Sequence, residues 1–252
     1  MHDPKDPDSL SENTIRSIFR DSKGNLWIGT DGGLNKFIYK TQKFIRYTQC
    51  SNNTNCLSNN TVWVIKEYPD GILWVGTGNG LNKLVPGDSE ESLIFKHYKT
   101  ETNNKNSISH NAVRTIYVDL SAQKESGVFR TGRAGKKKGI LWIGTNDGLN
   151  RFDPETGIFI RYNKEEGLPN GYIYGILSDD KGNLWMSHNK GLSQFNIETE
   201  KFRNFDIHDG LQNNEFNTGA YYKNSKGVMF FGGPNGFNRF HPKNVNANPY
   251  VP

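Results

Sequence analysis

The sequence predicts an all-β fold built from five copies of one unit, and three observations support this. A short motif centred on an aromatic residue occurs five times. Apart from one longer interval, its copies recur about every 45 residues. The chain of 252 residues contains 27 glycines, and no segment shows helical apolar spacing. Four short strands fit one such period, which is the pattern of a β-propeller whose blades surround a central axis.

The repeated motif reads Gly-Asn-Leu-Trp-Ile-Gly-Thr in its first copy, and Phe230 replaces Trp in the last. Its copies stand at residues 24–30, 71–77, 139–145, 182–188 and 227–233. We expect each Trp to pack between neighbouring sheets, and each Gly to allow a turn or a close approach of two backbones. The motif is therefore interpreted as structural.

Each unit is expected to contain four strands. In the first unit they are residues 14–19, 26–29, 34–37 and 43–47, separated by glycine turns. We expect one domain over residues 1–252, with blades at about 9–49, 57–100, 107–163, 167–206 and 211–242 and a tail at 243–252. The fifth blade lacks a recognisable fourth strand, so nineteen strands are found where five complete blades need twenty. We therefore expect an open arc or a weakly sealed ring.

Residues 120–139 interrupt the third unit and explain the long interval. This insertion holds six basic residues and one acidic residue, so it accounts for the whole net charge of +5. The rest of the chain is neutral, and we expect a solvated loop and no nucleic-acid partner.

Cys50 and Cys56 are the two cysteines of the chain. They are too few for a closed metal site, which normally needs four ligands, and no cofactor is expected. In an exported protein a local disulfide is the preferred interpretation, and in a cytosolic one two inert thiols are preferred. The sequence contains no membrane-spanning apolar stretch and no signal-peptide pattern.

The repeat is best preserved at residues 111–162, and it resembles the two-component regulator propeller repeat over almost the whole chain. In that family such blades form the periplasmic sensor region of hybrid sensor histidine kinases, often in Bacteroidetes that use glycans. The resemblance implies the last five blades of a seven-bladed ring, normally followed by an immunoglobulin-like domain, a membrane span and a kinase. A five-bladed ring in its own right is the alternative. Residues 178–185 also match the Asp-box of sialidases, which stabilises a hairpin and is not catalytic.

Propeller ligands usually bind at the face that carries the loops entering each innermost strand. One repeat position on this face holds two arginines and two aromatic residues, namely Arg16, Trp63, Arg114 and Tyr174. Guanidinium donors and stacking planes suit a sugar or an acidic glycan, although ordinary variation at a loosely constrained position is the alternative. Further candidates are turn or ligand residues at a second repeat position and one loop histidine: Asn13, Asn60, Asn111 and His188.

The favoured function is a sensor that binds a ligand without changing it. Expected partners are an oligosaccharide or other small ligand, the rest of a sensor kinase, and a second copy in a homodimer. The alternatives are a propeller lyase or hydrolase, similar to the streptogramin lyases, and a protein-interaction platform. An enzyme needs converging acid and base groups, and the histidines stand mostly at unrelated repeat positions without a matching carboxylate pair.

Overall fold

A computed structural model describes residues 1–51, 55–68, 71–86, 93–120 and 139–245. Within these ranges the chain forms nineteen strands and two short 3₁₀ helices, η1 (Ile207–Asp209) and η2 (Pro242–Asn244). The all-β class and the number of strands are therefore as predicted. None of the described helices is long and apolar enough to cross a membrane.

The strands form five antiparallel sheets, and each sheet is one blade with its strands in chain order. Blade one contains β1 (Ile15–Arg20), β2 (Leu26–Thr30), β3 (Leu34–Ile38) and β4 (Lys43–Tyr47). Blade two contains β5 (Val62–Glu67), β6 (Leu73–Thr77), β7 (Gly80–Pro86) and β8 (Leu93–Tyr98). Blade three contains β9 (Val113–Asp119), β10 (Ile140–Thr145), β11 (Leu149–Phe152) and β12 (Phe159–Tyr162).

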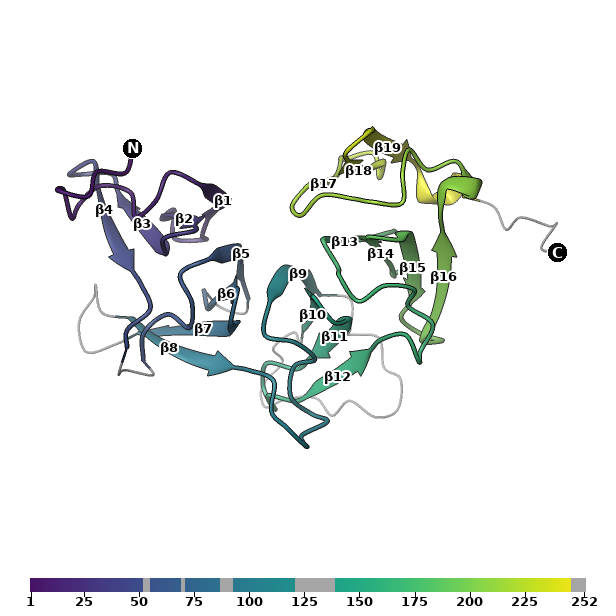
Figure 1. The fold of residues 1–252 in the computed structure, drawn as a ribbon, viewed down its shortest axis with the longest axis horizontal. Coiled ribbons are helices and arrows are strands. Elements are labelled where there is room, and N and C mark those ends of the chain that lie inside the picture. The colour runs from purple at the N-terminus through teal and green to yellow at the C-terminus, as the bar shows by residue number, and fades with distance from the viewer. Residues whose placement is uncertain (52–54, 69–70, 87–92, 121–138, 246–252) are drawn as a thin grey trace.

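Blade four contains β13 (Gly175–Ser178), β14 (Asn183–His188), β15 (Gly191–Asn196) and β16 (Lys201–Phe205). Blade five contains β17 (Tyr221–Lys223), β18 (Met229–Gly233) and β19 (Gly236–Phe240), and it has three strands among the described residues. The innermost strands β1, β5, β9, β13 and β17 surround a common axis, and an open sector separates blade one from blade five (Figure 1). The basic insertion lies almost entirely outside the described residues.

Neighbouring blades are joined by one apolar interface that repeats along the chain. Trp74 and Leu81 of blade two are completely buried in a cluster with Val113 and Ile116 of blade three. A Cβ on Gly76 would lie 2.6 Å from the Val113 Cγ1 atom, so the glycine of the motif allows the two blades to approach. The expected structural roles of Trp and Gly are thus confirmed at this interface.

The Asp-box of blade four forms a closed hairpin. The Asp179 carboxylate accepts hydrogen bonds from the Trp185 indole at 3.0 Å and from the side chain of Asn183 at 2.9 Å. Burial acts to raise the pKa of Asp179, but these bonds and two backbone bonds outweigh it and lower the pKa. The carboxylate therefore fixes the turn and the tryptophan.

One contact on the axis joins blades that are not neighbours. The Tyr221 hydroxyl of blade five lies 2.9 Å from Thr115 Oγ1 of blade three. The Tyr221 ring passes over Gly175 of blade four, where no side chain would fit. A single side chain therefore links the innermost strands of three blades.

Candidate functional site

Three of the four residues predicted at one repeat position meet in space. Arg16, Trp63 and Arg114 are the second residues of β1, β5 and β9, which are adjacent innermost strands. The Cζ atoms of Arg16 and Arg114 lie 4.6 and 4.1 Å from the centroid of the Trp63 ring. We call these three residues the Arg–Trp cluster. Its contacts are cation–π interactions, in which a cation is attracted to the electron-rich face of an aromatic ring.

A backbone irregularity places each member of the Arg–Trp cluster. The residues before and after Arg16 pair with consecutive residues of β2, so Arg16 is the additional residue of a β-bulge. Trp63 and Arg114 interrupt the pairing of β5 with β6 and of β9 with β10 in the same way. A bulge redirects the side chain of its extra residue, and such bulges occur frequently beside functional sites.

Each of the two arginines donates hydrogen bonds to a residue of its own blade, and these two acceptor residues stand at equivalent repeat positions. Arg16 donates to Asp31 from Nε at 3.0 Å and from Nη2 at 2.7 Å, and Arg114 donates from Nε to the Asn146 side-chain oxygen at 2.8 Å. Asp31 and Asn146 each follow the Thr that ends the repeated motif. Sequence reasoning did not identify these two supports, although aligning the turns between the second and third strands would have revealed them.

The electrostatic surroundings of the two guanidinium groups differ. The hydrogen bond to Asp31 raises the pKa of Arg16. Burial lowers the pKa of Arg114, and the positive charge of Arg16 adds to this, while the nearby phenols of Tyr172 and Tyr174 oppose it. Among the described residues no carboxylate forms an ion pair with Arg114. The Arg–Trp cluster therefore contains two cations, and among the described residues the Asp31 carboxylate pairs with one of them.

Tyr174, the fourth predicted residue, lies immediately before β13 and is close enough to Arg114 to influence its pKa. Its ring is partly buried against the cluster that contains Trp185 and Phe231. Tyr172, which sequence reasoning missed, is 43% exposed at the same edge. The aromatic side of the site thus continues from blade two to blade four.

The predicted asparagines have structural contacts. The side-chain oxygen of Asn13 accepts from the backbone N–H of His2 at 2.8 Å, and Asn60 and Asn111 accept at 2.7 and 2.8 Å from backbone N–H groups likewise eleven residues earlier. Each bond closes the loop that enters an innermost strand. A ligand role for these asparagines stays a prediction, and the observed bonds favour the turn role.

His188 lies at the end of β14 and is completely buried. Its Nε2 atom lies 2.8 Å from Ser193 Oγ, and its Nδ1 atom accepts from the Lys190 N–H at 3.1 Å. Burial, with a smaller contribution from the charge of Lys190, lowers its pKa to about 4. Both ring nitrogens are engaged inside the blade, so the geometry does not favour His188 as a ligand-binding residue.

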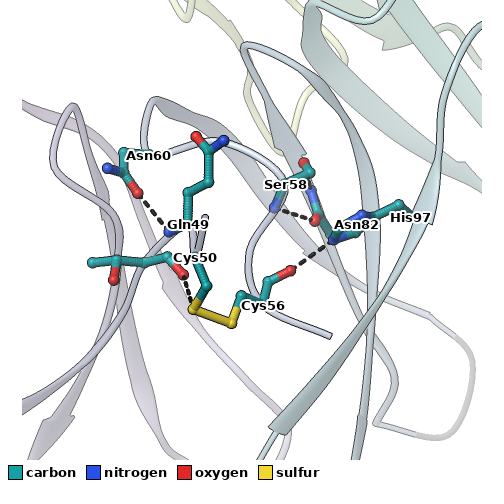
Figure 2. Close-up of a disulfide and its surroundings, with 8 residues drawn as sticks. Gln49, Cys50, Cys56, Ser58, Asn60, Asn82 and His97 are labelled. Atoms are coloured by element: carbon teal, nitrogen blue, oxygen red, sulfur yellow. Dashed lines mark hydrogen bonds between the residues drawn. A yellow bond between two sulfur atoms is a disulfide. The ribbon is translucent and has the colours of Figure 1, made fainter. Parts of the chain in front are cut away.

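The cysteines form a disulfide, which the sequence left open. Cys50 and Cys56 are joined with a Cα–Cα distance of 5.7 Å, in the connection between blades one and two (Figure 2). The Gln49 N–H donates to Asn60 on one side, and the Cys56 carbonyl lies 2.6 Å from His97 Nε2 on the other. The disulfide therefore fixes the loop that leads into β5 and Trp63.

Within the described ranges no group of three or more His, Cys, Asp or Glu side chains is arranged to hold a metal ion. The polar groups at the Arg–Trp cluster are guanidinium, indole, phenol, amide and carboxylate groups. Their chemistry is suited to hydrogen bonding and stacking.

Comparison with known proteins finds a family model that matches three segments and solved structures that resemble almost the whole chain. Residues 9–32, 56–79 and 167–190 match the model of the family described as two component regulator propeller. No curated protein matches the chain. The extracellular domain of the putative hybrid two component system BT3049 from B. thetaiotaomicron is 26% identical with a TM-score of 0.72. That match covers 96% of this chain but 30% of the other, so this chain spans less than a third of its relative.

Two more distant structures share the fold alone. A catalytically inactive virginiamycin B lyase from Staphylococcus aureus is 14% identical with a TM-score of 0.61, and the match covers 94% of this chain and 70% of the lyase. PorZ, a surface component of the type-IX secretion system of Porphyromonas gingivalis, is 14% identical with a TM-score of 0.64, and the match covers 96% and 34% of the two chains. The segments that match the two component regulator propeller model stand at equivalent places in blades one, two and four, so the match falls on the same part of the repeat each time.

Proposed function

We propose that this chain is the ligand-binding part of a periplasmic sensor in a two-component system. The observation that carries the proposal is the convergence of Arg16, Trp63 and Arg114 from three blades on one face. A ligand at this face would contact several blades at once, which is how a small molecule can influence a large domain. The proposed ligand is an oligosaccharide, because hydroxyl-rich rings suit planar hydrogen-bond donors beside aromatic groups.

The proposed sensor binds its ligand without chemical change. A general acid or base must reach the reacting group, and His188, one of the two loop histidines that could share this face, is buried with both nitrogens engaged. The Asp31 carboxylate already forms an ion pair with Arg16 at 2.7 Å. These contacts support binding in preference to hydrolysis or elimination.

The proposal also concerns the whole protein. The relative that this chain resembles is an extracellular domain of a putative hybrid two component system. We propose that further blades complete a seven-bladed ring and that an immunoglobulin-like domain and a membrane span transmit the signal to a histidine kinase. Pairing of two such chains would place two kinases side by side.

Screening the purified chain on an oligosaccharide array, followed by calorimetry on the retained sugars, tests the proposal. Trp63→Ala should weaken binding by about tenfold or more, as expected for removal of a central aromatic contact. Tyr222→Ala is the matched control, because Tyr222 is 63% exposed on blade five and should not affect affinity. A thermal melt verifies that both variants fold.

Two results would contradict the proposal. If no oligosaccharide binds, the ligand class is wrong. If a bound sugar is converted to product during long incubation, the chain is an enzyme and the sensor proposal fails.

A further inference from the structure

Arg16 and Arg114 are supported by the same construction with one chemical difference. Asp31 presents two acceptor oxygens, which receive Nε and Nη2 of Arg16 at 3.0 and 2.7 Å. Asn146 receives Nε of Arg114 at 2.8 Å, and its second polar atom is an amide nitrogen, which is a donor. An amide nitrogen cannot accept from a guanidinium group, so Arg114 lacks the second bond that Arg16 has.

The uncompensated charge of Arg114 is also partly removed from water. The side chain is half-buried and stacks on Trp63, 4.1 Å from the ring centroid. A cation–π contact of this kind attracts a cation more weakly than a carboxylate partner does, so it does not replace a counter-charge. The positive charge of Arg16 adds repulsion. The local balance therefore favours an anion beside Arg114.

We infer that the Arg–Trp cluster binds an anionic group of the ligand, a carboxylate or a sulfate, through the unpaired edge of the Arg114 guanidinium. The inference rests on the proposed binding of an oligosaccharide at this face and specifies its chemical class. The anion occupies at Arg114 the role that the Asp31 carboxylate has at Arg16. A bidentate guanidinium–carboxylate or guanidinium–sulfate contact satisfies both charge and geometry.

This inference discriminates between sugars. A neutral sugar offers hydroxyl groups, which leave the charge of Arg114 uncompensated. A uronic acid or a sulfated sugar supplies one negative charge at a defined place on the ring. The ligand is therefore expected to contain acidic sugar units, and its affinity should decrease with added salt because a partly exposed charge pair is screened.

Two isosteric substitutions test the inference in opposite directions. Asn146→Asp provides the missing carboxylate, so it should pair with Arg114 and weaken anion binding by about tenfold, as expected for loss of one charge-assisted hydrogen bond. Asp31→Asn removes the carboxylate from Arg16, so it should strengthen anion binding. Both replacements keep the size of the side chain and one acceptor oxygen, and thermal melting of each variant verifies the fold.

The probes are sodium sulfate, sodium glucuronate and glucose, titrated at constant ionic strength while the side-chain N–H signals of arginine are followed by NMR. The sulfate and glucuronate titrations separate a preference for sulfated sugars from one for uronic acids. We expect one or both anions to shift the Arg114 signal in the wild type and in Asp31→Asn, and to shift it much less in Asn146→Asp. Glucose should produce little change in any variant.

The outcomes separate this inference from the proposed function. If oligosaccharides bind at the face but neither their charge nor Asn146→Asp changes affinity, the inference is overturned and the proposed function stands. If the anions bind with the expected dependence on Asn146→Asp and no oligosaccharide is retained, the anion site stands and the proposed function fails. Equal binding of glucose and glucuronate also overturns the inference.

Discussion

Blades two, three and four are covered on both faces, whereas blades one and five are each covered on one face. Ile18 in blade one is 64% exposed, but its repeat equivalents Ile65, Ile116 and Ile176 are 1–3% exposed. Phe237 in blade five is 63% exposed, but the leucine at its position in each of the other four blades is no more than 1% exposed. The same repeat position is therefore core in one blade and surface in another.

The two uncovered faces are of opposite kinds. Within the chain, the Trp and Leu face of each blade packs on the Ile and Val face of the next. Blade five leaves a face of the first kind uncovered, at Phe230 and Phe237, and blade one leaves a face of the second kind uncovered, at Ile15 and Ile18. The difference shows that a blade is stabilised mainly by its neighbours, and that the stability contributed by a residue depends on its blade.

Paired truncations at the leucine position should show the largest effect. Leu81→Ala removes a completely buried side chain and should lower the free energy of unfolding by about 2–5 kcal/mol, because it leaves a cavity between two blades. Phe237→Ala should change it by less than ~1 kcal/mol, since most of that ring is in water. Urea denaturation measures both values. Equal losses would show that the face of blade five is covered in solution.

Acidification should selectively weaken the interior of blade four. The position of His188 is occupied by Thr30 in blade one and by Gly233 in blade five, so neither end blade titrates there. Burial lowers the folded pKa of His188 to about 4 from the ordinary 6.5, so the unfolded chain takes up a proton first as the pH falls. The neutral, buried His188 therefore contributes to the free energy of unfolding. The contribution is fully present above pH ~6.5 and is lost progressively toward pH ~4, by up to about 3 kcal/mol. Denaturation at several pH values should show this slope, and His188→Thr should reduce it.

Replacing the second glycine of the motif by alanine should also distinguish an interface between blades from an uncovered face. The expected difference in the free energy of unfolding is smaller than that between the truncations at the leucine position. In Gly76→Ala the new Cβ would lie 2.6 Å from Val113 of the next blade, and such overpacking costs about 1–3 kcal/mol. In Gly232→Ala the nearest atom is the Ala220 Cβ of the same blade at 3.1 Å, so a small shift suffices and the loss should stay below ~1 kcal/mol. Thermal unfolding of the two variants is the measurement. A reversed order would contradict the proposed spacing role of Gly76.

Self-association should be the weakest effect. It tests whether the uncovered face of blade five in one molecule binds the uncovered face of blade one in another. Because the two faces are complementary, the isolated chain should associate head to tail as its concentration rises. Phe237→Asp and Ile18→Asp should each reduce this association several-fold, by placing a charge on an apolar contact. Sedimentation velocity over a hundredfold concentration range provides the readout. A compact monomer at every concentration, with blades one and five in contact, would show that five blades close on themselves.

The sequence predicted the fold because a residue's position in the repeat determines which strand it belongs to and where along that strand it lies. The expected strand at residues 14–19 is observed as Ile15–Arg20, and the expected strand at 43–47 is observed as Lys43–Tyr47. Residues at one repeat position on adjacent blades lie side by side, and for this reason Arg16, Trp63 and Arg114 could be placed together. The pattern likewise predicted no fourth strand for blade five, and the described residues contain three strands of that blade.

The contacts between different positions of one repeat could not be predicted. The ring nitrogens of His188 bond to Ser193 and Lys190, which replace the residues found at those places in other blades. The supports Asp31 and Asn146 lie on a different strand connection from the arginines they hold. Alignment of repeats compares equivalent positions and carries no information on pairs formed between different positions.

The contact between Tyr221 and Thr115 joins two blades that are not neighbours. Links such as Ser22 with Glu67 or Tyr117 with Ser178 join a blade to its neighbour, but Tyr221 reaches past blade four to blade three. Arg114 lies on β9, the strand that Tyr221 contacts through Thr115, whereas Arg16 lies on β1 of blade one. A ligand held by Arg114 would therefore lie next to a strand that is tied to blade five, at the other end of the series of blades from Arg16.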